Sequence, residues 1–72
     1  MRLSYYPETD SLYIDLSPKP SVESREVTEG VVLDYDEAGN LTGIDIDNAS
    51  AKLDLRELII DKLPSEIHKI PT

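Results

Sequence analysis

Apolar and polar residues alternate in two neighbouring stretches, RLSYY (2–6) and SLYIDLS (11–17). A period of two is typical of strands that bury one face. The residues between them, PETD (7–10), favour a turn, because proline presets φ and an aspartate can accept hydrogen bonds from backbone amides. A four-residue loop would set the register of this hairpin as Tyr6 with Ser11, Tyr5 with Leu12, Leu3 with Ile14 and Arg2 with Asp15. That register places the apolar side chains on one face, which supports the hairpin.

The stretch VVLDYDEAGNLTGIDID (31–47) predicts a second hairpin, with Gly39 suited to the left-handed position of its loop. Two registers compete. Pairing Asp36 with Asn40 would bring carboxylates of the second strand onto the apolar face, and an unpartnered buried carboxylate is costly. Pairing Asp36 with Leu41 instead gathers the apolar residues of both strands, so the hydrophobic pattern favours this second register. It sends four carboxylates to the opposite, outer face: Asp34, Asp36, Asp45 and Asp47.

The remaining segments complete the expected fold. VESREV (22–27) is a charged strand candidate at or near a sheet edge, after the two prolines of PKPS (18–21). DLRELIIDKLP (54–64) has apolar residues at helical spacing, with Asp54 as N-cap candidate and Pro64 as its end. Ser50 is an alternative N-cap one turn earlier. The sequence thus predicts one α+β domain (1–72): a small antiparallel β-meander of four to five strands (2–47), one C-terminal helix (about 51–63) packed on its apolar face, and a tail (64–72).

Composition excludes several classes of protein. The chain of 72 residues has no cysteine, so disulfides and thiolate metal sites are excluded. Fifteen acidic and seven basic residues give a formal net charge of −8, which would repel a phosphate backbone, so we expect no nucleic-acid partner. No stretch has the length and apolar character of a membrane span or signal peptide, and we expect a cytoplasmic protein without membrane contact.

The acidic hairpin partly matches the pattern of a calcium-binding loop. Asp34, Asp36, Gly39 and Asp45 match the first, third, sixth and twelfth positions of an EF-hand-like loop. The fifth position is Ala38, the twelfth is not a glutamate, and both flanks have the pattern of strands where helices are needed. Asp34, Asp36 and Asp45 are therefore only weak metal candidates, and we expect no cofactor.

We predict no catalytic residues. Aspartates two apart on a strand are neighbours, but catalytic carboxylates need a pocket that perturbs their pKa values, and a solvated sheet face offers none. His68 is the single histidine, and its position between isoleucines near the end of the chain indicates an exposed tail residue.

The segments SYYPETDSLYIDLS (4–17) and REVTEGVVLDYDEAGNLTGIDIDNAS (25–50) resemble the YuzE-like family of small bacterial domains of unknown function. The likeness spans residues 3 to about 50. It implies a compact strand-rich domain and brings no accepted activity, although some relatives are suspected of being antitoxin-like partners of small toxins. The residues at matching positions are Tyr5, Asp10, Leu12, Tyr13, Asp34, Asp36, Gly39, Gly43, Ile44 and Ala49.

Two functional hypotheses follow. The first is a non-enzymatic protein-interaction module, such as an antitoxin-like inhibitor of a small basic partner, because opposite charges speed association. The thin core also makes self-association as a homodimer plausible. The second is a small-ligand or divalent-metal-binding protein that uses the same carboxylates. Under the first hypothesis the partner-binding residues are Asp34, Asp36, Asp45 and Asp47, with Tyr6 and Tyr13 as anchors.

Overall fold

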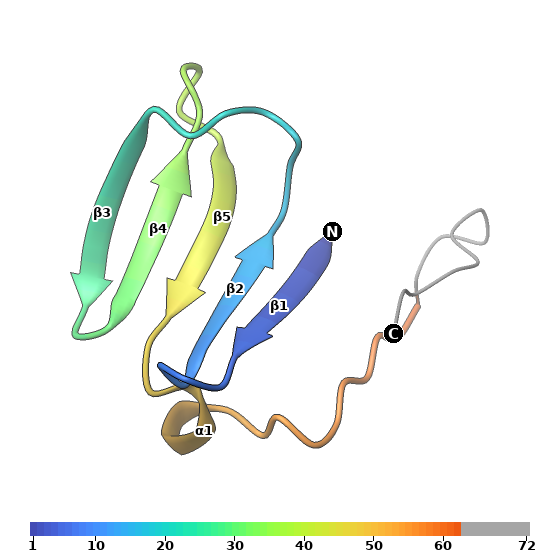
Figure 1. Ribbon diagram of the computed structural model, residues 1–72. Coiled ribbons are helices and arrows are strands. Elements are labelled where there is room, and N and C mark those ends of the chain that lie inside the picture. The colour runs from blue at the N-terminus through green and yellow to red at the C-terminus, as the bar shows by residue number, and fades with distance from the viewer. Residues whose placement is uncertain (63–72) are drawn as a thin grey trace.

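A computed structural model describes residues 1–62 and shows one open sheet of five strands followed by a short helix (Figure 1). The expected α+β fold with an antiparallel sheet is confirmed, and all strand pairs given by the structure are antiparallel. The predicted tail, including His68, lies outside the described residues. The elements are β1 (Arg2–Tyr6), β2 (Ser11–Asp15), β3 (Glu23–Thr28), β4 (Val31–Tyr35), β5 (Leu41–Ile46) and α1 (Ala49–Lys52).

The strand order is β1-β2-β5-β4-β3, so the chain is not one continuous meander. A first hairpin, β1–β2, lies beside a three-stranded meander, β3–β4–β5, and the last strand of the meander pairs with β2. The connection between β2 and β3 (16–22) carries the chain across one end of the sheet to the far edge (Figure 1). The expectation of a strand near an edge at 22–27 is confirmed by β3.

The predicted register of the first hairpin is confirmed at all of its expected pairs, from Arg2 with Asp15 to Tyr6 with Ser11. The body of the second hairpin also has the favoured register, with Leu33 opposite Ile44. Near the loop, however, a bulge shifts the pairing by one residue. Both competing registers therefore occur in one hairpin, on either side of the bulge.

The bulge results from the turn chemistry at the end of the hairpin. The Asp36 amide donates to the Asn40 carbonyl at 2.8 Å, and the Gly39 amide donates to the Asp36 carbonyl at 3.0 Å. Gly39 has a φ of 84°, as expected for a three-residue loop that ends in a left-handed residue. The tight loop pairs Asp36 with Asn40, whereas the apolar face requires the register one residue away. Thr42 is the extra residue of the bulge, without a partner on β4, and it allows both registers to occur in the same hairpin.

The prediction of a helix over about 51–63 is wrong for the described residues. α1 ends at Lys52, Leu53 is extended, and no helix is found in 53–62. The Asp54 carboxylate accepts a hydrogen bond from the Arg56 amide at 3.0 Å, the contact expected of an N-cap, but no helical turn follows it within the described residues. A helix of this length is marginal in water unless a packed face stabilises it.

α1 lies at one end of the sheet rather than on the apolar face (Figure 1). The apolar face is therefore only partly covered: within residues 1–62, Leu12 and Ala49 are the buried hydrophobic residues, at 7% and 0% exposed. Leu58 and Ile59 are 59% and 68% exposed, so the apolar positions of 54–62 do not provide the missing cover. The fold is a thin sheet with two accessible faces.

Candidate functional site

The outer face of the sheet is acidic. Cross-strand partners lie on the same face, and the pairs Asp15 with Gly43, Gly43 with Asp34, and Tyr13 with Asp45 define it. Asp47 is placed at the end of this face by Ser11, whose hydroxyl donates to the Asp47 carboxylate at 3.2 Å. The acidic face, as we name it, consists of Asp15, Glu26, Asp34, Asp45 and Asp47.

Tyr13 crosses this face instead of projecting from it. Its hydroxyl donates to the Asp34 carboxylate at 2.8 Å, and so its ring passes over Gly43 of the intervening strand. A Cβ at Gly43 would lie 2.0 Å from the Tyr13 hydroxyl oxygen, so only glycine leaves room for the ring in this position. The hydrogen bond to Asp34, together with burial and nearby carboxylates, raises the pKa of Tyr13 to about 12.

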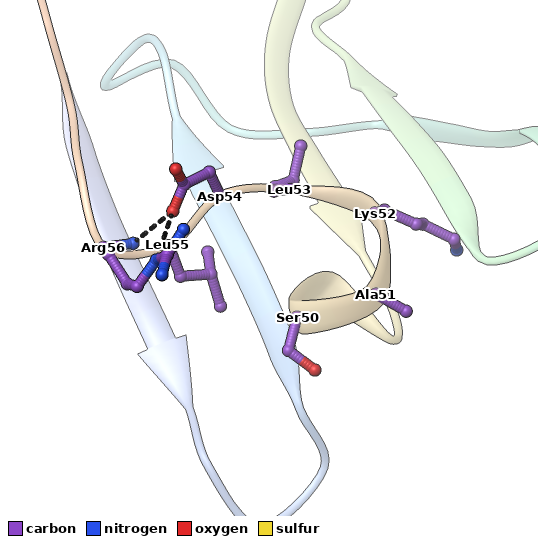
Figure 2. Close-up of a pocket in the computed structure, with 7 residues that line it drawn as sticks. All are labelled: Ser50, Ala51, Lys52, Leu53, Asp54, Leu55 and Arg56. Atoms are coloured by element: carbon purple, nitrogen blue, oxygen red, sulfur yellow. Dashed lines mark hydrogen bonds and ion pairs between the residues drawn. The ribbon is translucent and has the colours of Figure 1, made fainter.

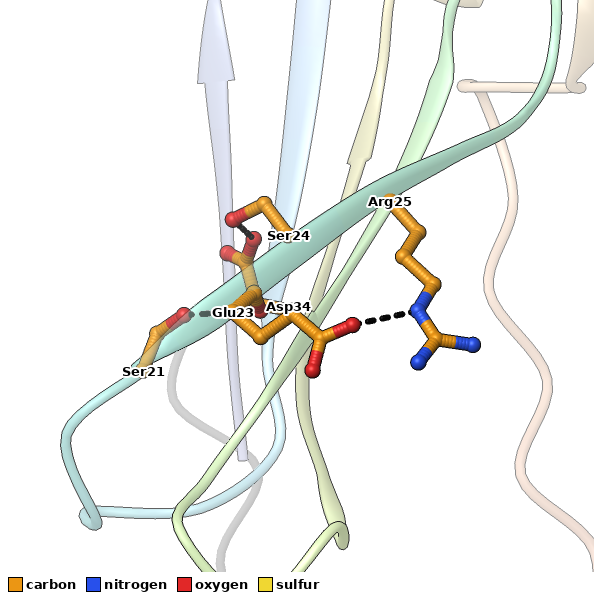
Figure 3. A network of polar contacts seen from close by, with 5 residues as sticks. All are labelled: Ser21, Glu23, Ser24, Arg25 and Asp34. Atoms are coloured by element: carbon orange, nitrogen blue, oxygen red, sulfur yellow. Dashed lines mark hydrogen bonds and ion pairs between the residues drawn. The ribbon is translucent and has the colours of Figure 1, made fainter.

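Asp34 receives a second donor from the edge strand. The Ser24 hydroxyl donates to its other oxygen at 2.6 Å, and Figure 3 shows this contact on the opposite side of β3 from Glu23 and Arg25. Tyr13, Asp34 and Ser24 thereby connect β2, β4 and β3 across β5. Both oxygens of Asp34 are engaged, and this set of contacts, which we call the tyrosine clamp, stabilises the sheet from its outer side.

Asp36 also has a structural role. Its Oδ1 accepts hydrogen bonds from the Ala38 amide at 3.0 Å and the Asn40 amide at 2.8 Å, which is the arrangement of an Asx turn. The residue is buried, at 7% exposed. Of the predicted partner-binding carboxylates, Asp36 is therefore held in the turn, whereas Asp45 and Asp47 remain on the acidic face.

On the acidic face Asp15 and Asp47 are exposed, and Asp45, nearer the centre, is half-buried. Partial burial, followed by the charges of Asp47 and Asp34, raises the pKa of Asp45 above its ordinary value. Within residues 1–62 the ion pairs are Arg25 with Glu23 and Arg56 with Asp54, and neither involves the acidic face. The charges of Asp47 and Asp34 disfavour the ionised form of Asp45, whereas the cations Arg2, opposite Asp15, and Lys52, which donates to the Asp47 carbonyl at 2.7 Å, lie at the margins of the face.

A second polar cluster closes the end of the sheet near α1. The Asp10 carboxylate accepts hydrogen bonds from the Ser50 hydroxyl at 2.7 Å, from the Ser50 amide and from the Tyr5 hydroxyl at 2.7 Å. The bonds from Ser50 and then Tyr5 hold the pKa of Asp10 below its ordinary value. The Ala49 amide donates to the Asp10 carbonyl at 2.8 Å. The β1–β2 turn thus caps α1. The sequence did not predict this role of Asp10, because the two segments are far apart in the chain.

The two predicted tyrosine anchors differ in their surroundings. Tyr6 is 52% exposed and makes no side-chain hydrogen bond among those found for residues 1–62, so its phenol ring remains accessible. Tyr13 is engaged by Asp34. Sequence reasoning missed Ser24, which has no signal beyond its position opposite Asp34 in the sheet.

The metal candidates do not converge. Asp34 is occupied by hydroxyl donors and Asp36 by turn amides, and no group of three or more potential ligand side chains is placed to hold an ion in the part of the chain that the structure describes. A hollow lined by residues 50–56 comes from one continuous segment (Figure 2). It brings together no side chains from different elements, as an active site usually does.

These features define the class of protein as a small α+β domain with one open antiparallel sheet. A family model described as Protein of unknown function (DUF2283) matches residues 2–50, more than half of the chain, and the chain belongs to this family. Comparisons with curated proteins and with solved structures give no match. No helix within residues 1–62 is long and apolar enough to cross a membrane.

The family match ends inside α1, at residue 50. Residue 50 is the serine that donates to Asp10, so the matched region includes both partners of the helix cap. The tyrosine clamp and the Asp36 turn also lie inside it. The polar motif residues noted in the sequence, Tyr5, Asp10, Tyr13, Asp34 and Asp36, all make hydrogen bonds that hold this scaffold.

Proposed function

We propose that this protein is a non-enzymatic interaction module whose acidic face binds a small basic protein, in the manner of an antitoxin-like inhibitor. The observation that carries this proposal is the clustering of carboxylate charge around Asp45. Asp45 lies beside Asp47 and Asp34, its pKa is raised partly by their charges, and the ion pairs of the described residues lie elsewhere. Lysine or arginine side chains of a partner would relieve this repulsion on binding.

The accessible carboxylates supply the contact. Asp45, Asp47 and Asp15 would accept charge-assisted hydrogen bonds from the partner, while Asp34 and Asp36 remain engaged within the domain. Tyr6, exposed at the end of the same face, would add an aromatic contact. The formal net charge of −8 would speed association with a basic protein.

An acidic surface of this kind can compete with RNA for a basic binding site. A toxin that acts on RNA needs cationic side chains to hold phosphates, and the carboxylates of a flat sheet can occupy the same side chains. The resemblance of residues 3–50 to the YuzE-like family supports this proposal, and with it a bacterial source and a cytoplasmic location.

The test uses the full-length chain and its co-purified partner. We expect a small basic protein to co-purify at low salt from the native host, and the purified pair is then measured by isothermal titration calorimetry. The variant Asp45→Asn/Asp47→Asn should bind at least about tenfold more weakly, equivalent to a loss of about 1.4 kcal/mol.

A matched control separates a specific surface from bulk charge. Asp54→Asn/Glu57→Gln removes two exposed carboxylates away from the acidic face, so that both double variants change the net charge from −8 to −6, that is −8 + 2. The control should bind like the unchanged protein. Equal weakening by both variants would show that net charge alone drives binding, and absence of any partner at low salt would refute the proposal.

A further inference from the structure

The two edges of the sheet differ in their protection against pairing. At one edge, β3 carries Glu23, Arg25 and Glu26 and contains a bulge between Glu26 and Thr28. Charged side chains and bulges are features that prevent an edge strand from pairing with another chain. β3 is therefore protected, although all six of its residues are exposed.

At the other edge, β1 lacks these features. Its five residues, RLSYY, contain one charged side chain and no proline, and every residue pairs regularly with β2 without a bulge. Leu3, Tyr5 and Tyr6 are 41%, 44% and 52% exposed. A regular, largely apolar edge strand with exposed side chains is a site at which another strand can add to the sheet.

We propose that β1 pairs with β1 of a second copy of this chain, antiparallel and centred on Ser4. The sequence of β1 is self-complementary about this residue. A two-fold axis at Ser4 places Leu3 opposite Tyr5 of the second copy on the apolar face, and Arg2 opposite Tyr6 on the other face. Both pairs favour cross-strand association, the first by apolar contact and the second by a cation–π contact.

The charges at this edge support a second copy as the partner. Among the ion pairs found for residues 1–62, none involves Arg2, which lies near one end of β1. At the other end, the β1–β2 turn carries the exposed Glu8. In the proposed register Arg2 lies opposite Tyr6 of the second copy, two residues from its Glu8, and the symmetry places a positive and a negative charge near each other at both ends of the shared strand pair. The edge is thus locally complementary although each chain carries a net charge of −8.

The proposed dimer is isologous, with the two-fold axis perpendicular to the sheet. Each copy contributes five strands to one continuous sheet, and the two acidic faces lie side by side on the same surface. This inference goes beyond the proposed function and does not depend on it, because it follows from the edges of the sheet alone.

The first experiment measures the mass of the full-length chain by sedimentation equilibrium over a range of protein concentrations. We expect a monomer–dimer equilibrium. Ser4→Lys and Ser4→Glu each place two like charges directly opposite at the axis, so each variant should be monomeric. An equimolar mixture of the two should form a heterodimer, because opposite charges then meet at the same position.

A control at the other edge makes the result decisive. Val27→Lys adds a charge to β3, where Val27 is 54% exposed, and should leave the dimer intact. Circular dichroism verifies that every variant is folded. The proposal is refuted if the unchanged chain stays monomeric near millimolar concentration, if the Ser4 variants remain dimeric, if their mixture stays monomeric, or if Val27→Lys alone dissociates the dimer.

A second measurement fixes the register. Directly opposite residues of antiparallel strands have Cα atoms about 4.5–5.5 Å apart, within the span of a disulfide. The chain has no cysteine, so Ser4→Cys introduces a single thiol. Under mild oxidation Ser4→Cys should form a covalent dimer much faster than Val27→Cys. Equal rates for the two variants would contradict pairing through Ser4.

Discussion

Replacing Gly43 with alanine is the most direct test of the tyrosine clamp. The new Cβ would lie 2.0 Å from the Tyr13 hydroxyl oxygen and 2.6 Å from the adjoining ring carbon, Cζ. Neither distance is compatible with van der Waals contact, and the ring is the part that can move, since the neighbouring backbone is fixed by strand pairing. The substitution should therefore displace Tyr13 and break its hydrogen bond to Asp34.

The expected loss of stability follows from three contributions. A hydrogen bond to a charged group contributes about 1.5–3 kcal/mol, and displacement of the ring forfeits roughly 1 kcal/mol of apolar burial. Alanine is favoured over glycine within a strand by about 0.5–1 kcal/mol, which offsets part of the loss. The net cost is about 2 kcal/mol. For a domain of this size that corresponds to a fall in the melting temperature of roughly 10 °C.

Urea unfolding followed by circular dichroism measures this cost, and a second background identifies its cause. In a Tyr13→Val chain the ring is absent, so Gly43→Ala should no longer destabilise the fold and should stabilise it by about 0.5 kcal/mol. The reasoning is refuted if Gly43→Ala is neutral in the unchanged chain, or if its cost is the same in both backgrounds.

Four further predictions follow from individual side chains. Asp34→Asn removes the charged acceptor of the Tyr13 hydroxyl, so the pKa of Tyr13 should fall from about 12 toward 10.0 in an absorbance titration; an unchanged value would contradict the clamp. The pKa of Asp10 is lowered in the folded state, so its ionised form stabilises the fold above pH 3.8, and this contribution is lost as the pH falls. Asp10→Asn should therefore be less stable than the unchanged chain at pH 6, with the difference shrinking below pH 3.8; a constant difference would argue against this linkage. Thr42 is 3% exposed and its Oγ1 has no hydrogen-bond partner within residues 1–62, so Thr42→Val should raise the free energy of unfolding by about 1 kcal/mol in urea titrations, whereas a loss would reveal a partner for the hydroxyl. The pKa of Asp45 is raised by burial and by neighbouring carboxylates, so its charge destabilises the fold at neutral pH. Asp45→Asn should be more stable at pH 7, and the gain should decrease as the pH approaches 3.8; no gain at pH 7 would show that the charge costs nothing.

The hairpin registers were predictable because they depend on neighbouring residues. A slip of one residue would exchange the two faces of a strand, so the positions of Leu12 and Ile14 were enough to fix the first hairpin. In the second hairpin the same reasoning placed Leu33 opposite Ile44 but missed the bulge at Thr42. The apolar pattern and the preferred geometry of the turn demand different registers, and a pattern of polarity alone does not describe how a backbone satisfies both.

The sequence predicted the negative charge of the candidate site and its position on the outer face, but not the roles of its individual residues. The alternation placed Asp34, Asp45 and Asp47 on the outer face, and the structure agrees. It could not show that both oxygens of Asp34 are engaged, or that Asp36 serves its own turn. Those roles depend on hydroxyl and amide donors, some of which come from strands far away in the sequence.

The sequence by itself determined the strands, the two hairpins and the opposite characters of the two faces, since these follow from local periodicity and turn residues. Only the tertiary structure decided that β5 pairs with β2, that Asp10 caps α1 and that residues 53–62 do not continue the helix after Lys52. Each of these depends on whether residues distant in sequence meet. A helical pattern near the end of the chain forms a helix only if a packed surface offsets the cost of ordering it, and the apolar face does not provide that contact for residues 53–62.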